Sequence, residues 1–188
     1  MSRVKVLVPL AKGFEEIEAV SIIDVLRRAE IEVLVASLGK NSVVEGANGI
    51  SILTNINISD IKVDELEMIV LPGGLGGTNA LAADANVQNI LKEMNAKGKN
   101  IGAICAAPFA LHKAGVLKEK YTCYPSFENE IKLDGYMGAE KMVVKDENIM
   151  TSRGPATAIC FALEIVKKLK GNEVYESVKN GLLANYCE

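Results

Sequence analysis

The chain has 188 residues, of which 49% are hydrophobic, and a formal net charge of −3. This length and composition are typical of a single soluble domain with a sizeable core, and they exclude a disordered or low-complexity chain. No basic stripe favours nucleic acid as a partner, and no apolar run is long enough to cross a membrane. With no export signal we expect a cytoplasmic protein whose four widely spaced cysteines are reduced, namely Cys105, Cys123, Cys160 and Cys187.

The first half of the chain alternates short apolar runs with amphipathic segments. The runs are nearly continuous, as in strands buried on both faces, and Val87, Ile90, Leu91 and Met94 have helical spacing. Asn48-Gly49 is a hairpin turn signal between two β-prone runs. We therefore expect strands at 4–9, 32–38 and 68–71, helices at 15–29 and 84–97, and a hairpin at 43–54.

The second half continues the alternation, although 116–141 has no clear pattern. We expect a strand at 101–104, a strand pair at 142–145 and 149–151, a helix opened by Pro155 and ended near Gly171, and a last helix at 173–183. Buried strands alternating with helices predict an α/β sandwich, with a mainly parallel, doubly wound sheet. Ligands of such folds bind at the carboxyl ends of the strands.

Cys105 lies where the strand at 101–104 stops and a helix begins. Pro108 is tolerated only in the first turn of a helix, so the helix starts within a residue or two of Cys105. This strand–turn–helix pattern resembles a nucleophile elbow with cysteine in the serine position. A helix N-terminus favours the thiolate, so we expect a lowered thiol pKa. The alternative is a small buried hydrophobe that ends a core strand.

Two other loops are expected at the same edge of the sheet. The first carries Glu15, Glu16 and Glu18, any of which could act as a protonated hydrogen-bond donor or proton shuttle beside the sulfur, or simply stabilise a helix N-terminus. The second, at 72–77, is rich in glycine, and its N–H groups could bind an oxyanion or only form a tight turn. It matches neither a dinucleotide fingerprint nor a phosphate loop.

His112 is the only histidine and lies two helical turns beyond Cys105. By helical rise it is ~10 Å from the sulfur, so a Cys–His dyad is not expected. No metal-ligand spacing is present, and we expect no metal or other cofactor.

Four segments together resemble the ThiJ/PfpI superfamily, also called the DJ-one family: LAKGFEEIEAV at 10–20, VLPGGLGGTNAL at 70–81, AICAAPFAL at 103–111 and TSRGPATAICFALEIV at 151–166. The elbow and the terminal NYCE are most similar to the bacterial YajL-like branch. The resemblance implies a flavodoxin-like sandwich, usually a homodimer, with Cys105 as the reactive cysteine and Glu18 as its protonated partner. It further implies oxyanion contacts from the backbone of Gly73, Gly74 and Ala106, and an anion-binding role for Arg153.

The resemblance also implies an activity. Members act as glutathione-independent glyoxalases or deglycases on methylglyoxal, related 2-oxoaldehydes or their adducts, and others serve in oxidative stress as sensors or chaperones. Ala106 replaces the histidine of the protease-like branch, so peptidase activity is not expected, and Tyr124 stands where animal members have a histidine. We expect a Cys105-dependent glyoxalase or deglycase in which either Glu18 acts as both acid and base or the Tyr124 hydroxyl orients the substrate. The alternative is a non-catalytic redox sensor or chaperone.

Overall fold

The centre of the molecule is a seven-stranded sheet. A computed structural model describes residues 4–187. The sheet order is β5-β2-β1-β6-β7-β9-β8, and only the pairing of β8 with β9 is antiparallel. A separate hairpin, β3–β4, lies beside it. The strands are β1 Lys5–Leu10, β2 Glu32–Ser37, β3 Val43–Glu45, β4 Ser51–Leu53, β5 Ile56–Asn57, β6 Met68–Leu71, β7 Asn100–Ile104, β8 Val143–Asp146 and β9 Ile149–Ser152.

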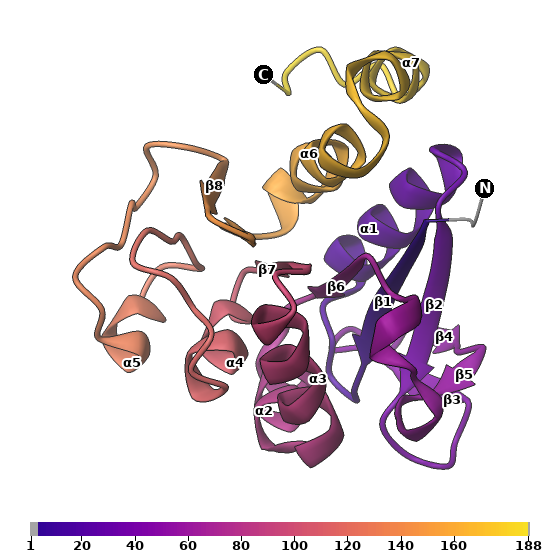
Figure 1. Cartoon of the computed structure of the whole chain (residues 1–188), viewed down its shortest axis with the longest axis vertical. Coiled ribbons are helices and arrows are strands. Elements are labelled where there is room, and N and C mark those ends of the chain that lie inside the picture. Colours follow the sequence, from indigo (N-terminus) through magenta and orange to yellow (C-terminus); the bar gives the residue numbers. More distant parts are fainter. Residues whose placement is uncertain (1–3, 188) are drawn as a thin grey trace.

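Helices cover both faces of this sheet, as Figure 1 shows, with α1, α6 and α7 on one side and α2, α3 and α4 on the other. The α-helices are α1 Glu16–Arg28, α2 Leu75–Ala83, α3 Ala85–Ala96, α4 Pro108–Lys113, α5 Glu128–Ile131, α6 Ala158–Lys170 and α7 Asn172–Gly181. Three short 3₁₀ helices lie at η1 Ile58–Asp60, η2 Val63–Glu65 and η3 Pro155–Thr157. The expected doubly wound, flavodoxin-like α/β sandwich is confirmed.

The period-two geometry of the strands divides the core into two layers. Val6 and Val8 of β1 pack with the α1 and α6 layer, whereas Leu7 between them packs with the α2 to α4 layer. The same alternation recurs in β6, and all of these side chains are buried. A strand covered on both faces is apolar at every position, which explains the continuous runs seen in the sequence.

The strand register aligns three loops at the carboxyl edge of the sheet. Leu71 of β6 is opposite Ala103 of β7, and Ile104 of β7 is opposite Ser152 of β9. Positions 73, 105 and 153 therefore follow three neighbouring strands at the same level. The loop after β1 lies at the adjacent switch point, where the chain turns from β2 on one side to β6 on the other. The expected convergence of loops thus follows from the observed register.

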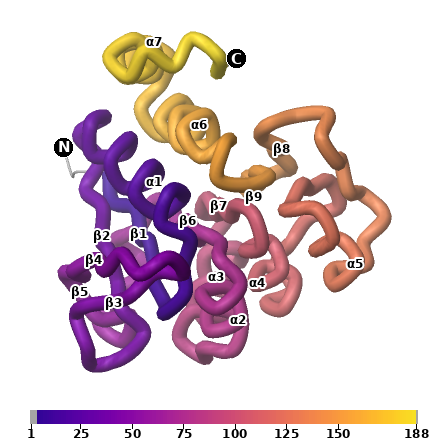
Figure 2. Tube along the Cα trace, turned by 180° about the vertical axis from the view of Figure 1, so that it is seen from behind, coloured from indigo at the N-terminus to yellow at the C-terminus, as the bar shows by residue number. Residues whose placement is uncertain are grey.

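Two parts of the chain differ from the sequence-based expectation. Gly76 and Gly77, expected in a loop, lie in α2, where a Cβ at Gly77 would be 2.9 Å from Phe14 Cα. Glycine here allows close packing of the helix on the segment after β1. The unassigned 116–141 region contains α5 and an isolated bridge between Tyr121 and Tyr136. Figure 2 shows this region at the opposite end of the molecule from the β3–β4 hairpin.

Candidate functional site

Cys105 occupies a sharp turn directly after β7. Its φ is +64°, a left-handed conformation that is unfavourable for residues other than glycine. Two neighbouring segments hold this turn: the Cys105 N–H donates to the Ser152 carbonyl at 3.0 Å, and its carbonyl accepts from the Tyr124 N–H at 2.8 Å. Helix α4 begins three residues later at Pro108. The strand–turn–helix pattern is confirmed, and the strained cysteine lies at its apex.

The three glutamates after β1 have three different contacts. Glu15 caps α1, its Oε2 accepting the Glu18 N–H at 2.7 Å. Glu16 points to the hairpin and accepts hydrogen bonds from the Asn48 backbone N–H, at 2.5 Å, and side-chain amide, at 3.0 Å. Glu18 is fully buried, and its carboxyl lies within hydrogen-bonding reach of the Cys105 sulfur. Of the three, Glu18 is therefore the one placed against the thiol.

Hydrogen bonds fix one oxygen of this carboxyl, while Glu18 Oε1 is buried without a hydrogen-bond partner among residues 4–187. The Gly73 N–H donates to Glu18 Oε2 at 2.7 Å, and the Glu15 N–H donates to the Gly73 carbonyl at 2.9 Å. With the cap between Glu15 and Glu18, these bonds link the first turn of α1 to the end of β6. A Cβ at Gly73 would lie 2.7 Å from both Glu18 Oε2 and Cys105 Cβ. The contact between the acid and the thiol therefore requires glycine at position 73.

Burial dominates the protonation of this pair. Burial raises the pKa of Glu18 from 4.5 to about 7. The hydrogen bonds from Cys105 and Gly73 act to lower this pKa, and the negative charge of Glu15 acts to raise it. Burial and the Glu18 carboxylate raise the pKa of Cys105 to about 12. The expectation of a lowered thiol pKa was therefore wrong, because a single short helix terminus does not offset the loss of hydration. At neutral pH the thiol therefore keeps its proton, whereas Glu18 is close to half ionised.

Two backbone N–H groups face the sulfur. Those of Gly74 and Ala106 hydrogen-bond to it and act to lower its pKa, opposing burial. Gly74 is the N-cap of α2 with φ +88°, a conformation suited to glycine. Gly73, expected to supply a third such contact, instead gives its N–H to Glu18. The site therefore has two donors directed at the reacting atom and one that orients the acid.

Tyr124 and Arg153 lie next to the Cys105 turn, but neither is among the groups that hydrogen-bond to the sulfur. The Tyr124 side chain is about half exposed and lies against Gly154, where a Cβ would be 3.3 Å from its ring. Arg153 follows Cys105 in register, but its guanidinium lies near Cys123 and within hydrogen-bonding reach of Tyr136. Its Nε is buried without a hydrogen-bond partner among residues 4–187.

The cysteines differ from the expected reduced state. Cys105 and Cys123 are free and buried, but Cys160 and Cys187 form a disulfide. The fold brings these two residues, 27 apart in the chain, to a Cα–Cα distance of 5.1 Å, which lies within the usual range for disulfides. Sequence spacing carries no signal for such a long-range pair.

Neither a metal site nor a membrane-spanning helix is found among residues 4–187. Within the described chain, no group of three or more histidine, cysteine or acidic side chains is arranged to hold a metal ion. His112 lies in α4, as expected. None of the helices in residues 4–187 combines the length and apolar character needed to span a bilayer. Two large cavities, of about 490 and 790 Å³, are lined by residues other than Cys105.

Comparisons with known proteins give consistent matches. The model of the DJ-1/PfpI family matches residues 4–168. The protein dj-1beta of Drosophila melanogaster is 42% identical, over 96% of this chain and 97% of its own length. The glutathione-independent glyoxalase DJR-1.2 of Caenorhabditis elegans is 35% identical, over 92% and 90%. The structure of oxidized Toxoplasma gondii DJ-1 has a TM-score of 0.91 at 40% identity, covering 96% of this chain and 98% of that one.

Proposed function

This chain belongs to the DJ-1/PfpI family, and we propose that it is a glyoxalase-type enzyme in which Cys105 converts a small 2-oxoaldehyde, or its adduct, to a 2-hydroxy acid. The observation that carries the proposal is the buried Glu18 carboxyl, held by Gly73 against a cysteine at the apex of a strained turn. A relative named as a glutathione-independent glyoxalase supports the same reaction class.

The first step uses Glu18 as a general base. With a pKa of about 7, Glu18 is substantially ionised at neutral pH, whereas the thiol is not. Its carboxylate takes the thiol proton as the sulfur adds to the aldehyde carbon, and the proton then passes to the new alkoxide. The product is a neutral hemithioacetal. The Gly74 and Ala106 N–H groups lie beside the sulfur, where they can stabilise the transient oxyanion.

The second step moves hydrogen between the two carbons. Glu18 removes the proton from C1 to give an enediol and delivers it to C2, while the hydroxyl proton on O1 passes to O2. This leaves a 2-hydroxyacyl thioester on Cys105. Water cleaves the thioester, so that methylglyoxal and water give lactate and the free thiol, with no external oxidant or reductant. A single carboxyl with a pKa near the working pH suits both proton transfers.

Access to the sulfur favours a small substrate. Only 8% of Cys105 is exposed, so a peptide could not approach its sulfur without displacement of the surrounding loops. In this proposal the half-exposed Tyr124 ring orients the substrate, and Arg153, which follows β9 at the same edge of the sheet, attracts an anionic group. These assignments favour an aldehyde or a small adduct over a peptidase substrate.

The test compares two cysteine variants of the purified protein. Cys105→Ala should reduce lactate formation from methylglyoxal to the uncatalysed rate, because the thioester cannot form. Cys123→Ala removes the other free buried thiol and should retain the wild-type rate within about twofold. Turnover by Cys105→Ala, or equal loss in both variants, would exclude Cys105 as the nucleophile. Free methylglyoxal is quantified separately from any adduct, since its removal alone mimics deglycase activity.

The hydrogen-bond donors around the Cys105 sulfur also favour a second candidate, an oxidation sensor or redox-regulated chaperone. Oxidation of the thiol by two hydroperoxide molecules gives a sulfinate and two molecules of water or alcohol. Its oxygens would accept hydrogen bonds from Glu18 and from the two N–H groups at the sulfur. Mass spectrometry after mild peroxide should find two added oxygens on Cys105 before Cys123. Equal oxidation of both would count against a sensor, and lactate formation by the reduced form separates the two functions.

We also propose that the protein is a homodimer. Ile17 and Val20 of α1 and Ile50 and Leu53 of the adjoining hairpin are between 48% and 72% exposed, and together they give this side apolar character. Ile17→Glu should produce a monomer in light scattering. Leu183→Glu introduces the same charge at an exposed apolar residue just after α7, and should leave a dimer. The reverse result would place the interface elsewhere.

A further inference from the structure

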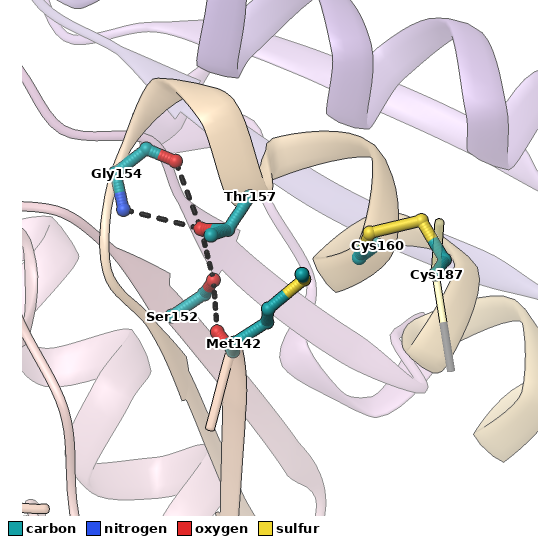
Figure 3. The surroundings of a disulfide bond; sticks show 6 residues. All are labelled: Met142, Ser152, Gly154, Thr157, Cys160 and Cys187. Carbon is teal, nitrogen blue, oxygen red and sulfur yellow. Dashed lines mark hydrogen bonds between the residues drawn. A yellow bond between two sulfur atoms is a disulfide. The ribbon is translucent and has the colours of Figure 1, made fainter. Parts of the chain in front are cut away.

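The Cys160–Cys187 disulfide joins the start of α6 to the last described residue of the chain. Cys160 is the third residue of α6, and Cys187 follows α7 in a short C-terminal tail, residues 182–187 (Figure 3). Both are nearly buried, at 4% and 2% exposure. This bond is remote from the acid–thiol pair and takes no part in the reaction proposed above.

The tail has few other attachments to the body of the protein. Its backbone hydrogen bonds are local: Leu182 donates to Val178, Leu183 to Asn180, Ala184 to Lys179, and Cys187 to Ala184. Leu182 and Ala184 pack on the core, while Leu183 and Tyr186 are 80% and 54% exposed. In the described part of the chain, the tail is therefore held on α6 by apolar contact and this one covalent bond.

One sulfur of the pair borders a large cavity. Cys160, but not Cys187, lines a space of about 790 Å³ between α6, β8 and the segment before β8. Met142 lines the same space and lies beside the disulfide in Figure 3. Its charged lining residues are Lys120, Lys141, Lys145, Glu140 and Glu164, of which Lys145 and Glu164 form an ion pair. Apart from that pair, the lining drawn from residues 4–187 has Lys120 and Lys141 against Glu140, and this positive excess favours an approaching thiolate over a cationic reagent.

We propose that Cys160–Cys187 is an exchangeable disulfide that latches the C-terminal tail, and that a small dithiol opens it through this cavity by attacking Cys160. The dithiol thiolate forms a bond to the Cys160 sulfur, the protein S–S bond breaks, and its electron pair leaves on Cys187, which takes up a proton. The second thiol of the reagent then displaces Cys160. The reagent leaves as a cyclic disulfide, and the protein holds two thiols.

Reduction then releases the tail. Without the covalent bond, residues 182–187 keep only their local hydrogen bonds and the packing of Leu182, Ala184 and Cys187 on the core. A disulfide reagent such as oxidised dithiothreitol reverses the process. The inference does not depend on the proposed enzymatic function, since Cys105 has no part in the exchange.

The test measures exchange in the native protein. We expect dithiothreitol to make Cys160 and Cys187 alkylatable while circular dichroism remains native, and oxidised dithiothreitol to restore the bond. Amide hydrogen exchange at 182–187 should become at least ~tenfold faster on reduction. Cys187→Ser should show the fast exchange under both conditions, and Cys123→Ser should respond like the wild type. Cys105→Ala should also respond like the wild type, which separates failure of the latch from failure of the enzyme.

Two results would overturn the proposal. One is a disulfide that opens only when the circular dichroism signal is lost, since exchange would then require unfolding. The other is unchanged hydrogen exchange at 182–187 in the reduced, folded protein. The direction of attack has its own readout: after brief treatment with 2-mercaptoethanol and acid quenching, the adduct should lie on Cys160 with Cys187 free. An adduct on Cys187 would refute entry through the cavity.

Discussion

The two free cysteines of this chain, Cys105 and Cys123, share most of the properties by which reactive thiols are sought. Both are buried, and in both, burial together with a nearby carboxylate, Glu18 or Glu128, raises the pKa to about 12. They differ in backbone and access. Cys105 has φ +64° and is 8% exposed, whereas Cys123 is fully buried in a small cluster with Tyr121 and Ile131.

This comparison shows that the raised thiol pKa does not distinguish Cys105 from Cys123. The distinguishing features are the strained turn, which presents the sulfur at the edge of the sheet, and the acid fixed beside it by Gly73. Variants that disturb these features should change Cys105 and leave Cys123 as it is.

The largest effect is expected from Gly73→Ala. Its Cβ would lie 2.7 Å from both Glu18 Oε2 and Cys105 Cβ, so the acid and thiol must separate. We expect lactate formation to be abolished and the free energy of unfolding to fall by about 1–3 kcal/mol, the usual range for overpacking. Gly39→Ala is the control, because nothing lies within 4 Å of its Cβ position. Near-wild-type activity in Gly73→Ala would contradict the site geometry.

A large effect is also expected from Glu18→Gln, in the pH dependence of stability. The folded pKa of Glu18, about 7, exceeds its ordinary value of 4.5, so its contribution to stability is full below pH 4.5 and is lost as pH rises through 7. The wild type should therefore lose about 3 kcal/mol relative to Glu18→Gln over this range, measured by urea unfolding.

The same variant tests the role of the carboxylate in reactivity. In the wild type, the rate of Cys105 alkylation should rise as pH passes about 7, where Glu18 becomes able to accept the thiol proton. Glu18→Gln should lack this rise. Glu128→Gln, which alters the carboxyl beside Cys123, should retain it. A rise that persists in Glu18→Gln would assign it to another group.

The smallest effect is expected from Glu15→Gln. The amide oxygen can still accept the Glu18 N–H, so the cap is kept, but the negative charge that raises the Glu18 pKa is lost. The midpoint of the alkylation profile should move below 7 with little change in stability. Glu15→Ala removes the cap as well and should cost about 1 kcal/mol. An unmoved midpoint in Glu15→Gln would show that the charge of Glu15 does not reach Glu18.

The features that could be predicted from the sequence are those set by nearby residues. The apolar run of β1, the spacing along α3 and Pro108 after Cys105 each determine their own element, and these predictions were confirmed. Helix α2 was missed because glycines, which disfavour isolated helices, are needed there for close packing on Phe14.

The remaining features depend on contacts between distant segments. The resemblance to a known family pointed to Glu18, but the physical reason for it is a hydrogen bond from Gly73, 55 residues away. The sign of the Cys105 pKa shift depends on burial, which local spacing does not reveal. The Cys160–Cys187 bond arises from packing of the tail on α6.

The contact between Glu16 and Asn48 constrains which substitutions the hairpin tolerates. Asn48 is exposed at the tip of a turn, where many polar residues are usually interchangeable, but it binds Glu16 in the same helical turn that carries Glu15 and Glu18. Replacement of Asn48 would keep the backbone hydrogen bond to Glu16 Oε1 but remove the side-chain donor to the buried Glu16 Oε2. Sequence variation at this surface loop is thereby limited by a buried acid in the helical turn that also carries Glu18.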